Sequence, residues 1–172
     1  AQSVVVPAGS TWKYMIGSAE ASSPIDAWRV LGFSDGSWAS GQAPFYYEAG
    51  SGYSGNTDLI SIYNTYTTVY LRKTFTITDA TNVASLRFQG AVDDGCIIWV
   101  NGVEMFRVNA PAGDVFYNGS APTADQEPWI IDQVIVTLDQ GVLQEGDNLL
   151  AVHLLNQSTG SSDLLFDVSV SA

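Results

Sequence analysis

The chain of 172 residues carries 6 Lys and Arg against 18 Asp and Glu, which gives a formal net charge of −12. So acidic a chain argues against nucleic acid and anionic lipid as partners, because both are bound through cationic side chains, whereas it permits cation binding. No apolar run approaches the roughly 20 residues of a membrane-spanning helix, so membrane insertion is not expected. The only cysteine, Cys96, can form neither a disulfide framework nor a thiolate metal site.

The whole chain is predicted to be β-structure. Its 16 glycines and its clusters of Ser, Thr, Asn and Asp interrupt the chain at short intervals, and no segment keeps the apolar period of a helix. A chain of this length can bury roughly 70% of its unfolded surface in one core. Because the sequence contains neither an internal repeat nor a long linker, residues 1–172 are expected to form a single domain.

The first predicted strand lies at the N-terminus, where Val4-Val5-Val6 precedes Pro7. The three residues before it lack the charged and apolar regions of a signal peptide and resemble a mature terminus. The valine run either forms the first strand of the chain's own sheet or lies in a segment, residues 1–7, that is donated to a neighbouring subunit. The sequence leaves both alternatives open. A second strand is predicted over residues 11–16.

Residues 17–58 form a loop-rich segment. Its second half, residues 42–55, is rich in glycine and tyrosine. Loops of this length inside a compact domain are uncommon and are often functional.

Regular strands are predicted from Thr68 onward. Asn101-Gly102 lies between two β-prone runs and predicts a two-residue hairpin turn, since both residues tolerate positive φ. Cys96 lies on the first strand of this hairpin and is expected to be a buried apolar residue. A second loop is predicted over residues 108–128. The last strand alternates strictly, and its inward side chains are Leu164, Phe166, Val168 and Val170. About eight or nine strands result, enough for a two-sheet antiparallel jelly-roll sandwich.

Five ordered groups of residues carry a resemblance to a known family. They are Trp28-Arg29 with residues 32–41, residues 70–75, residues 93–113, residues 146–152 and residues 161–167. In this order they resemble the galactose-binding-like β-sandwich domains that are appended to secreted bacterial hydrolases and large surface proteins. The resemblance covers nearly the whole chain. It implies a jelly roll, a secreted location and a non-catalytic role in carbohydrate binding or adhesion, and many such domains carry a structural calcium.

The chain departs from the pattern of that family at several positions. Ser34 stands where the family has an acidic residue. The strand after residue 152 often carries Glu and a later His and Gln, whereas this chain has His153, Leu155 and Asn156 there. Ligand contacts are therefore not transferred from the family to this chain.

The acidic pair Asp93-Asp94 is the main candidate cation site. Hard cations such as calcium take oxygen ligands from carboxylates, amides and backbone carbonyls. The pair resembles the one with which protective-antigen-type sugar-binding domains and flocculin-like adhesins hold a calcium ion that grips sugar hydroxyls. We predict Asp93, Asp94 and Asp163 as calcium ligands, helped by Asn109 or Asn156.

An alternative explanation of the same pair needs no metal. One of the two aspartates forms an ion pair with Arg107 or Arg72, and the other caps the turn that follows.

Sugar binding needs an aromatic platform beside a few hydrogen-bonding groups. Among the aromatic residues of the loops, Tyr53, Tyr117 and Trp129 are predicted to be exposed and to bind ligand, with Asn109 and Asn156 as polar neighbours. The tryptophans expected in the core are Trp12, Trp28, Trp38 and Trp99.

The sequence offers no pattern that favours catalysis. His153 is the only histidine and lies within a predicted strand, which favours neither a Ser–His–acid arrangement nor a zinc site. Glycoside hydrolysis needs two carboxylates about 5–10 Å apart across a cleft, whereas the adjacent Asp93 and Asp94 would point apart on an extended backbone. We therefore predict that the chain is not an enzyme.

Two functional hypotheses follow, and both place the chain outside the cell. In the first, it is a secreted carbohydrate-binding or adhesion module, stabilised by calcium, whose partner is a polysaccharide or glycan. In the second, it is a structural subunit of an extracellular filament or surface layer, which self-associates by donating its N-terminal strand.

Overall fold

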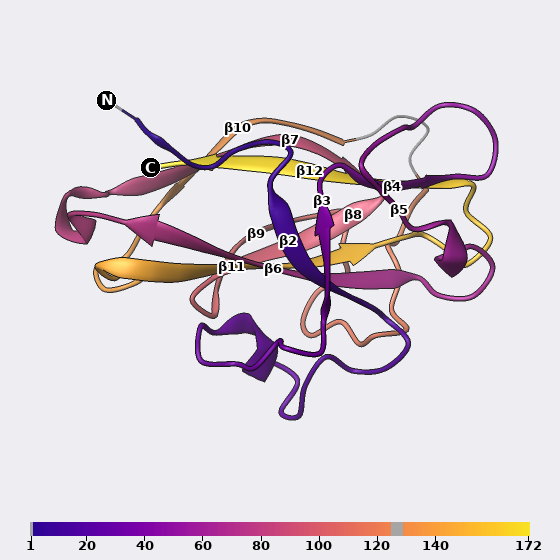
Figure 1. Cartoon of the computed structure of the whole chain (residues 1–172), viewed down its shortest axis with the longest axis horizontal. Helices are drawn as coiled ribbons and strands as arrows, with labels where there is room; N and C mark the ends of the chain where they lie inside the picture. The colour runs from indigo at the N-terminus through magenta and orange to yellow at the C-terminus, as the bar shows by residue number, and fades with distance from the viewer. Residues whose placement is uncertain (1, 125–128) are drawn as a thin grey trace.

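The computed structural model describes residues 2–124 and 129–172 as an all-β sandwich of two sheets (Figure 1). The strands are β1 (Val4–Val6), β2 (Thr11–Ile16), β3 (Ala39–Gln42), β4 (Phe45–Glu48), β5 (Thr57–Asp58), β6 (Thr68–Ile77), β7 (Ser85–Asp93), β8 (Gly95–Val100), β9 (Val103–Val108), β10 (Trp129–Thr137), β11 (Gly146–Leu155) and β12 (Asp163–Ser171). Three short 3-10 helices accompany them, namely η1 (Ala27–Arg29), η2 (Ile60–Ile62) and η3 (Ala80–Asn82). None of the helices in the described part of the chain is long and apolar enough to cross a membrane.

The two sheets confirm the predicted antiparallel jelly-roll sandwich. The first sheet has the order β10-β7-β12-β4-β5, with β1 also paired to β12, and the second has the order β3-β2-β6-β11-β8-β9. Among the described strands, the two-residue strand β5 is the exception to the antiparallel pattern, because it runs parallel to β4. Strands β3, β4 and β5 lie within the predicted loop of residues 17–58, because runs of two to four residues are too short to show an apolar alternation.

The N-terminal valines lie in the chain's own first sheet. Val4 pairs with Ser171 and Val6 with Val170, and the Ser3 amide donates to the Ala172 carbonyl at 2.8 Å. Figure 1 shows both chain ends at the same side of the sandwich. Of the two alternatives for this segment, the structure therefore has the first strand of the chain's own sheet.

The main core lies between the two sheets. On β12 the side chains alternate as predicted, and Leu164, Phe166, Val168 and Val170 are buried. Trp12 packs edge-on against Phe166 with ring centroids 5.3 Å apart. Cys96 is also buried here as a free thiol. These residues are distant in sequence and meet because every second residue of a strand faces the same side.

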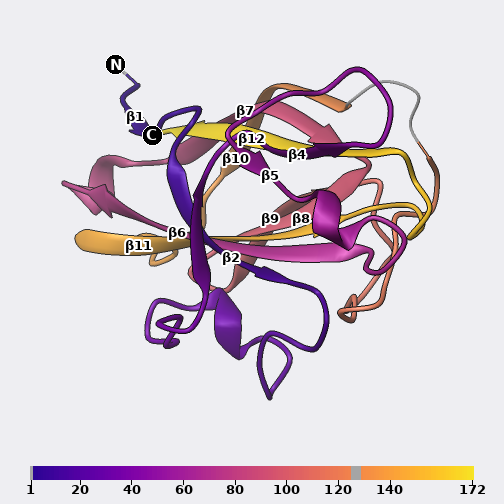
Figure 2. The same ribbon diagram turned by 45° about the vertical axis from the view of Figure 1, so that its right-hand side comes forward.

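A second apolar cluster lies on the outer face of the second sheet. Trp28, Trp38 and Trp99 are buried there around Tyr70 and His153. Residues 17–38 pass across this face and cover it (Figure 2). All four tryptophans predicted to be buried are therefore in a core, although the one at residue 12 belongs to a different cluster from the other three.

The hairpin turn between β8 and β9 also confirms its prediction. Asn101 and Gly102 both have positive φ, at 48° and 84°. The Asn101 side chain also joins the turn to β11, because its Oδ1 accepts from the Leu149 amide at 2.8 Å. The turn thus holds both the hairpin and its neighbouring strand.

Candidate functional site

Four carboxylates, three on different strands and one between β7 and β8, meet at one end of the sandwich, and we call them the acidic cluster. They are Glu48, Asp93, Asp94 and Asp163. Asp93 ends β7 and lies opposite Leu165 of β12, while Asp163 at the start of β12 lies opposite Glu48 of β4. Antiparallel pairing thus brings the end of one strand beside the start of the next. Glu48 had no place among the residues predicted from the sequence, since only the register of β4 and β12 brings it there.

Asp93 is the most unusual member of this cluster. It is only 1% exposed, and the Tyr53 hydroxyl donates to its Oδ2 at 2.5 Å. Its other oxygen, Oδ1, is buried and accepts no hydrogen bond from the described residues. Burial and the nearby carboxyls of Asp94 and Asp163 raise the pKa of Asp93 to about 7, although the hydrogen bond from Tyr53 opposes them.

Asp94 lies beside Asp93 and connects it to the end of β11. The peptide bond between the two aspartates is cis. Their carboxyls interact with each other, so they do not point apart as adjacent side chains on an extended backbone would. Asp94 Oδ2 accepts from the Gln157 amide at 2.8 Å, and the Asp94 amide donates to the Leu155 carbonyl at 3.2 Å. Asp163 is near enough to both aspartates to interact through charge, and its own pKa is raised by burial, Glu48 and Asp94.

The alternative in which Arg107 or Arg72 neutralises the aspartates is wrong. Arg107 pairs with Glu104, and Arg72 pairs with Asp35. Each arginine thus pairs with an acidic side chain other than Asp93 or Asp94. Neither of these two arginines therefore neutralises the acidic cluster.

The two asparagines predicted at this site support the loops around it. Asn109 Nδ2 donates to the carbonyls of Asp94 at 3.2 Å and Thr123 at 2.7 Å. Asn156 is fully buried, and its Nδ2 donates to the Tyr47 hydroxyl at 2.6 Å and to the Asp163 carbonyl at 3.2 Å. Both amides hold the backbone that carries the carboxylates, and neither side-chain nitrogen bonds to a carboxylate of the cluster.

Of the three predicted ligand-binding aromatic residues, Tyr53 is the one whose described side chain contacts the acidic cluster. Tyr53 is partly exposed and is fixed at two points, through its hydroxyl to Asp93 and through its amide to Glu48 Oε2 at 3.1 Å. Tyr117 packs instead against the second apolar cluster, and its amide donates to Glu20. Trp129 pairs through its backbone with Val92, but its side chain lies outside the described residues.

The acidic cluster offers a metal ion only part of the ligands that it needs. Within residues 2–124 and 129–172, no three His, Cys, Asp or Glu side chains are grouped so that they could hold a metal ion. Asp93, Asp94 and Asp163 do not form a ready three-carboxylate site. The buried and unsatisfied Oδ1 of Asp93, beside a second aspartate, does suit a cation that takes its other ligands from carbonyls, water or a ligand.

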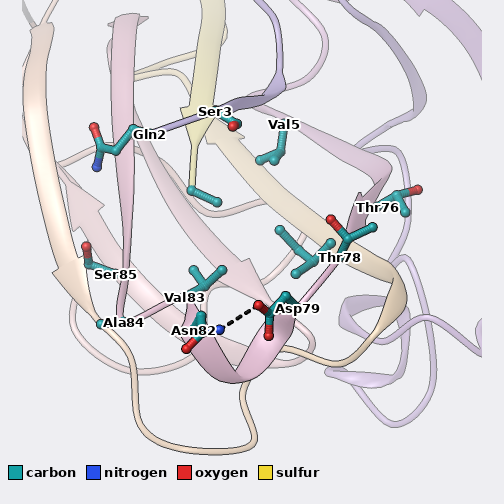
Figure 3. Close-up of a pocket in the computed structure, with 12 residues that line it drawn as sticks. Gln2, Ser3, Val5, Thr76, Thr78, Asp79, Asn82, Val83, Ala84 and Ser85 are labelled. Atoms are coloured by element: carbon teal, nitrogen blue, oxygen red, sulfur yellow. Dashed lines mark hydrogen bonds between the residues drawn. The ribbon is translucent and has the colours of Figure 1, made fainter.

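A pocket of about 700 Å³ lies at a different place, where the N-terminal segment meets the connection between β6 and β7 (Figure 3). Figure 3 shows Gln2, Ser3 and Val5 on one side of it and Asp79 and Asn82 on another. The Asn82 amide donates to the Asp79 carboxylate at 2.5 Å. Its lining contains no aromatic side chain, so the pocket lacks a surface on which a sugar ring could stack.

Comparison with protein-family models finds no match, and comparison with curated proteins finds none either. Solved structures do match. β-Glucuronidase 2 of Bacteroides uniformis aligns over 100% of this chain and 18% of its own, with a TM-score of 0.61 and 14% identity. The β-glucuronidase of Ruminococcus gnavus in complex with D-glucuronic acid aligns over 100% of this chain and 29% of its own, with a TM-score of 0.57 and 12% identity. The β-glucuronidase of Bifidobacterium dentium aligns over 90% of this chain and 20% of its own, with a TM-score of 0.55 and 11% identity.

At these identities the likeness shows a shared fold. The chain spans less than a third of the length of each of these enzymes. One further match is described as a calcium binding mutant of the Bacteroides uniformis enzyme. The fold is therefore one that occurs as a part of larger glycoside hydrolases.

Proposed function

We propose that this chain is a non-catalytic carbohydrate-binding module that works outside the cell and binds sugar at the acidic cluster through a calcium ion. The observation that carries the proposal is the Asp93 carboxylate, which is buried beside Asp94 with one oxygen lacking a hydrogen bond. A buried anion without a paired cation is costly. A bound cation would offset that cost. Support for a carbohydrate ligand comes from the fold, which the chain shares with parts of β-glucuronidases.

Calcium suits this donor set better than a transition metal. Calcium takes about 6–8 oxygen ligands and accepts a mixture of carboxylates, carbonyls and water. Asp93 and Asp94 would supply the carboxylates, and Asp163 would add negative charge nearby. The bound ion would then coordinate hydroxyl groups of a sugar. Tyr53 lies against the same carboxylates and would offer its ring as the apolar surface beside them.

A non-catalytic role is favoured by the burial of the groups that could catalyse. Asp93 and Asp94 are each 1% exposed, so neither carboxyl projects from the surface to attack or protonate a substrate directly. His153 is buried in the second apolar cluster, and burial lowers its pKa to about 3. A neutral, enclosed imidazole is not suited to exchange protons with a substrate.

Calcium binding is tested first, and without sugar. Calcium chloride is titrated calorimetrically into EDTA-treated protein, then into Asp94→Asn and into the control Asp139→Asn, which changes an exposed aspartate elsewhere. We expect saturable binding to the wild type and the control, and at least about a tenfold weaker binding to Asp94→Asn, since one charged ligand is lost. Absence of calcium binding to the wild type would remove the metal from the proposal.

Sugar binding is tested on a glycan array with calcium and with EDTA. The expected result is binding in calcium that is lost in EDTA and in Asp94→Asn, and kept in Asp139→Asn. Tyr53→Ala should weaken the same binding without abolishing calcium uptake, because it removes the ring and not a carboxylate. A chain that binds no glycan under either condition would refute the proposal.

A further inference from the structure

The loop between β4 and β5, residues 49–56, carries Tyr53 to the acidic cluster. Its other residues are all exposed, and three glycines and two serines are among them. Segments rich in Gly and Ser behave as flexible chains unless contacts fix them. The position of Tyr53 therefore depends on contacts that hold this loop.

Glu48, the last residue of β4, supplies two such contacts. Its Oε1 accepts from the Gly50 amide at 3.0 Å, and its Oε2 accepts from the Tyr53 amide at 3.1 Å. Hydrogen bonds to an ionised carboxylate are roughly twice as strong as neutral ones. The carboxylate thus ties the loop back to the end of the strand from which it leaves.

Gly52 allows the loop to close tightly over this carboxylate. A Cβ atom at this position would lie 2.8 Å from Glu48 Oε2, too close unless one of the two groups shifted. The missing side chain therefore leaves room for the Glu48 carboxylate between the two amides that it binds.

The closed loop places the tyrosine between two carboxylates. Its amide is bound by Glu48, and its hydroxyl donates to Asp93 Oδ2 at 2.5 Å. Glu48 itself lies opposite Asp163 on β12, so it is part of the acidic cluster, but each of its oxygens is engaged by a loop amide.

We propose that Glu48 is a positioning residue, which holds residues 49–56 so that the Tyr53 ring stands beside Asp93 before any ligand arrives. Fixing a loop in its binding conformation beforehand lowers the entropic cost of binding. Glu48 acts through Tyr53 and is not a calcium ligand. The use of the ring by a sugar rests on the proposed function, whereas the hold of Glu48 on the loop does not.

The hold is tested by amide hydrogen exchange, followed by NMR without metal or sugar. Glu48→Gln keeps the shape of the side chain but loses one acceptor, because its Nε2 can only donate. We expect the Gly50 or Tyr53 amide to exchange about tenfold faster or more. The Asn56 amide, which donates to the Pro44 carbonyl at 3.0 Å, should be unaffected. Unchanged exchange at both amides would overturn the proposal.

Glu145→Gln is the matched control. Glu145 also accepts from two backbone amides of a loop, those of Asp79 and Ala80. It precedes β11, whose other end lies beside the acidic cluster. This variant should leave the exchange of Gly50 and Tyr53 unchanged. Acceleration there as large as in Glu48→Gln would reflect a general loss of stability and overturn the proposal.

Action through the ring is tested by titration on the glycan array in calcium. Glu48→Gln and Tyr53→Ala should each weaken binding about tenfold, and the double variant should bind no more weakly than Tyr53→Ala alone, since the two residues act as one unit. Losses that add would overturn the proposal. In a titration with calcium chloride, Glu48→Gln should stay within about threefold of the wild type. A loss as large as that of Asp94→Asn would make Glu48 a ligand and overturn the proposal.

Gly52→Ala separates the position of the loop from the charge of Glu48. It keeps every carboxylate and disturbs only the closure of the loop, so glycan binding should weaken about threefold or more while calcium binding is kept. Wild-type glycan binding together with wild-type exchange of the Tyr53 amide would count against the proposal.

The outcome is separable from that of the proposed function. If the wild type binds no calcium but Glu48→Gln releases the Tyr53 amide, the positioning role stands and the acidic cluster is refuted as a calcium site. If calcium and sugar bind as proposed but Glu48→Gln changes neither exchange nor affinity, the positioning role is refuted alone.

Discussion

Asp93 and Arg72 are both buried charged side chains, yet the fold treats them in opposite ways. Arg72 is 4% exposed and bonds to two carbonyls and a carboxylate that all come from one covering segment. Asp93 is 1% exposed, bonds to one hydroxyl, and faces two other carboxylates. The charge of Arg72 is compensated by a carboxylate and two carbonyls, whereas Asp93 lies beside two further groups of its own negative sign.

This difference separates a structural charge from a candidate functional one. The bonds of Arg72 join residues 28–35 to the second sheet and so help to close the outer face over the tryptophans. Asp93 accepts a hydrogen bond from Tyr53, which lies in the loop between β4 and β5 of the same sheet. A buried carboxylate that stays unsatisfied destabilises the fold, which is why we infer that a ligand is its missing partner.

The largest expected effect comes from Arg72→Met. The substitution leaves the Asp35 carboxylate and two carbonyls without their partner, and removing one member of a buried pair costs about 3–5 kcal/mol. Urea unfolding measures it, and urea is preferred to guanidinium chloride because it does not screen charges. A loss smaller than about 1 kcal/mol would show that Arg72 is not the structural member of the comparison.

The second prediction concerns pH and is measured by urea unfolding in metal-free buffer. Asp93 has a pKa of about 7 in the fold against an ordinary 3.8. Between these values the folded chain keeps a proton that the unfolded chain has released, so this group lowers the free energy of unfolding as pH rises. His153 has a pKa of about 3 against 6.5. Between these two values the unfolded chain binds a proton on His153 that the folded chain does not bind, so this group raises the free energy of unfolding as pH rises.

The two groups therefore oppose each other between about pH 4 and pH 6.5. Relative to the wild type, Asp93→Asn should make the stability rise more with pH in this window, and His153→Gln should make it fall more. Each substitution should change the stability difference across the window by about 2–4 kcal/mol relative to the wild type. If both variants keep the wild-type profile, the burial of these two groups does not control their titration.

A smaller effect is expected from Tyr53→Phe, which removes the hydrogen bond that Asp93 accepts. At pH 8 and without calcium the free energy of unfolding should fall by about 1–2 kcal/mol, because a bond to a charged group is lost. At pH 5, where Asp93 is protonated, the loss should be less. Tyr46→Phe is the matched control on β4. Equal losses in both variants would mean that the loss of any tyrosine hydroxyl, and not of the bond to Asp93 in particular, is responsible.

The smallest effect is predicted for Arg107→Met. Arg107 pairs with Glu104 three residues away, and both side chains are partly exposed. Exposed pairs contribute about 0–1 kcal/mol. Because Arg107 also donates to the carbonyls of Pro111 and Gly113, we expect this variant to lose about 1 kcal/mol in all. The difference in the free energy of unfolding between this variant and the wild type should change little when the urea titration is repeated in high salt. A loss as large as that of Arg72→Met would contradict the distinction between buried and exposed pairs.

The strands and turns with strong local patterns were predictable from the sequence. The alternation of Leu164 to Val170 and the turn at Asn101-Gly102 depend on side-chain period and backbone preference within a few residues. The short strands β3, β4 and β5 were not predictable. Their pairing partners lie far along the chain, and their own residues carry too little pattern to reveal them.

The acidic cluster was predictable only in part. The adjacent Asp93 and Asp94 marked the corner as a candidate, and Asp163 was named with them. Glu48 and the bond from Tyr53 depend on the register of β4 against β12, a pairing more than a hundred residues apart in sequence. The calcium and the ligand-binding roles stay predictions, as does the role of Trp129.

The sequence by itself determined the fold class, the buried tryptophans and the hairpin, because these follow from apolar period and from the φ preferences of single residues. Only the tertiary structure decided how the charges are distributed. Arg72 met Asp35 and not the aspartates that the sequence suggested for it, and Lys13 came to lie opposite it. Electrostatic pairing depends on distances between residues remote in the chain, and only the folded arrangement of strands sets those distances.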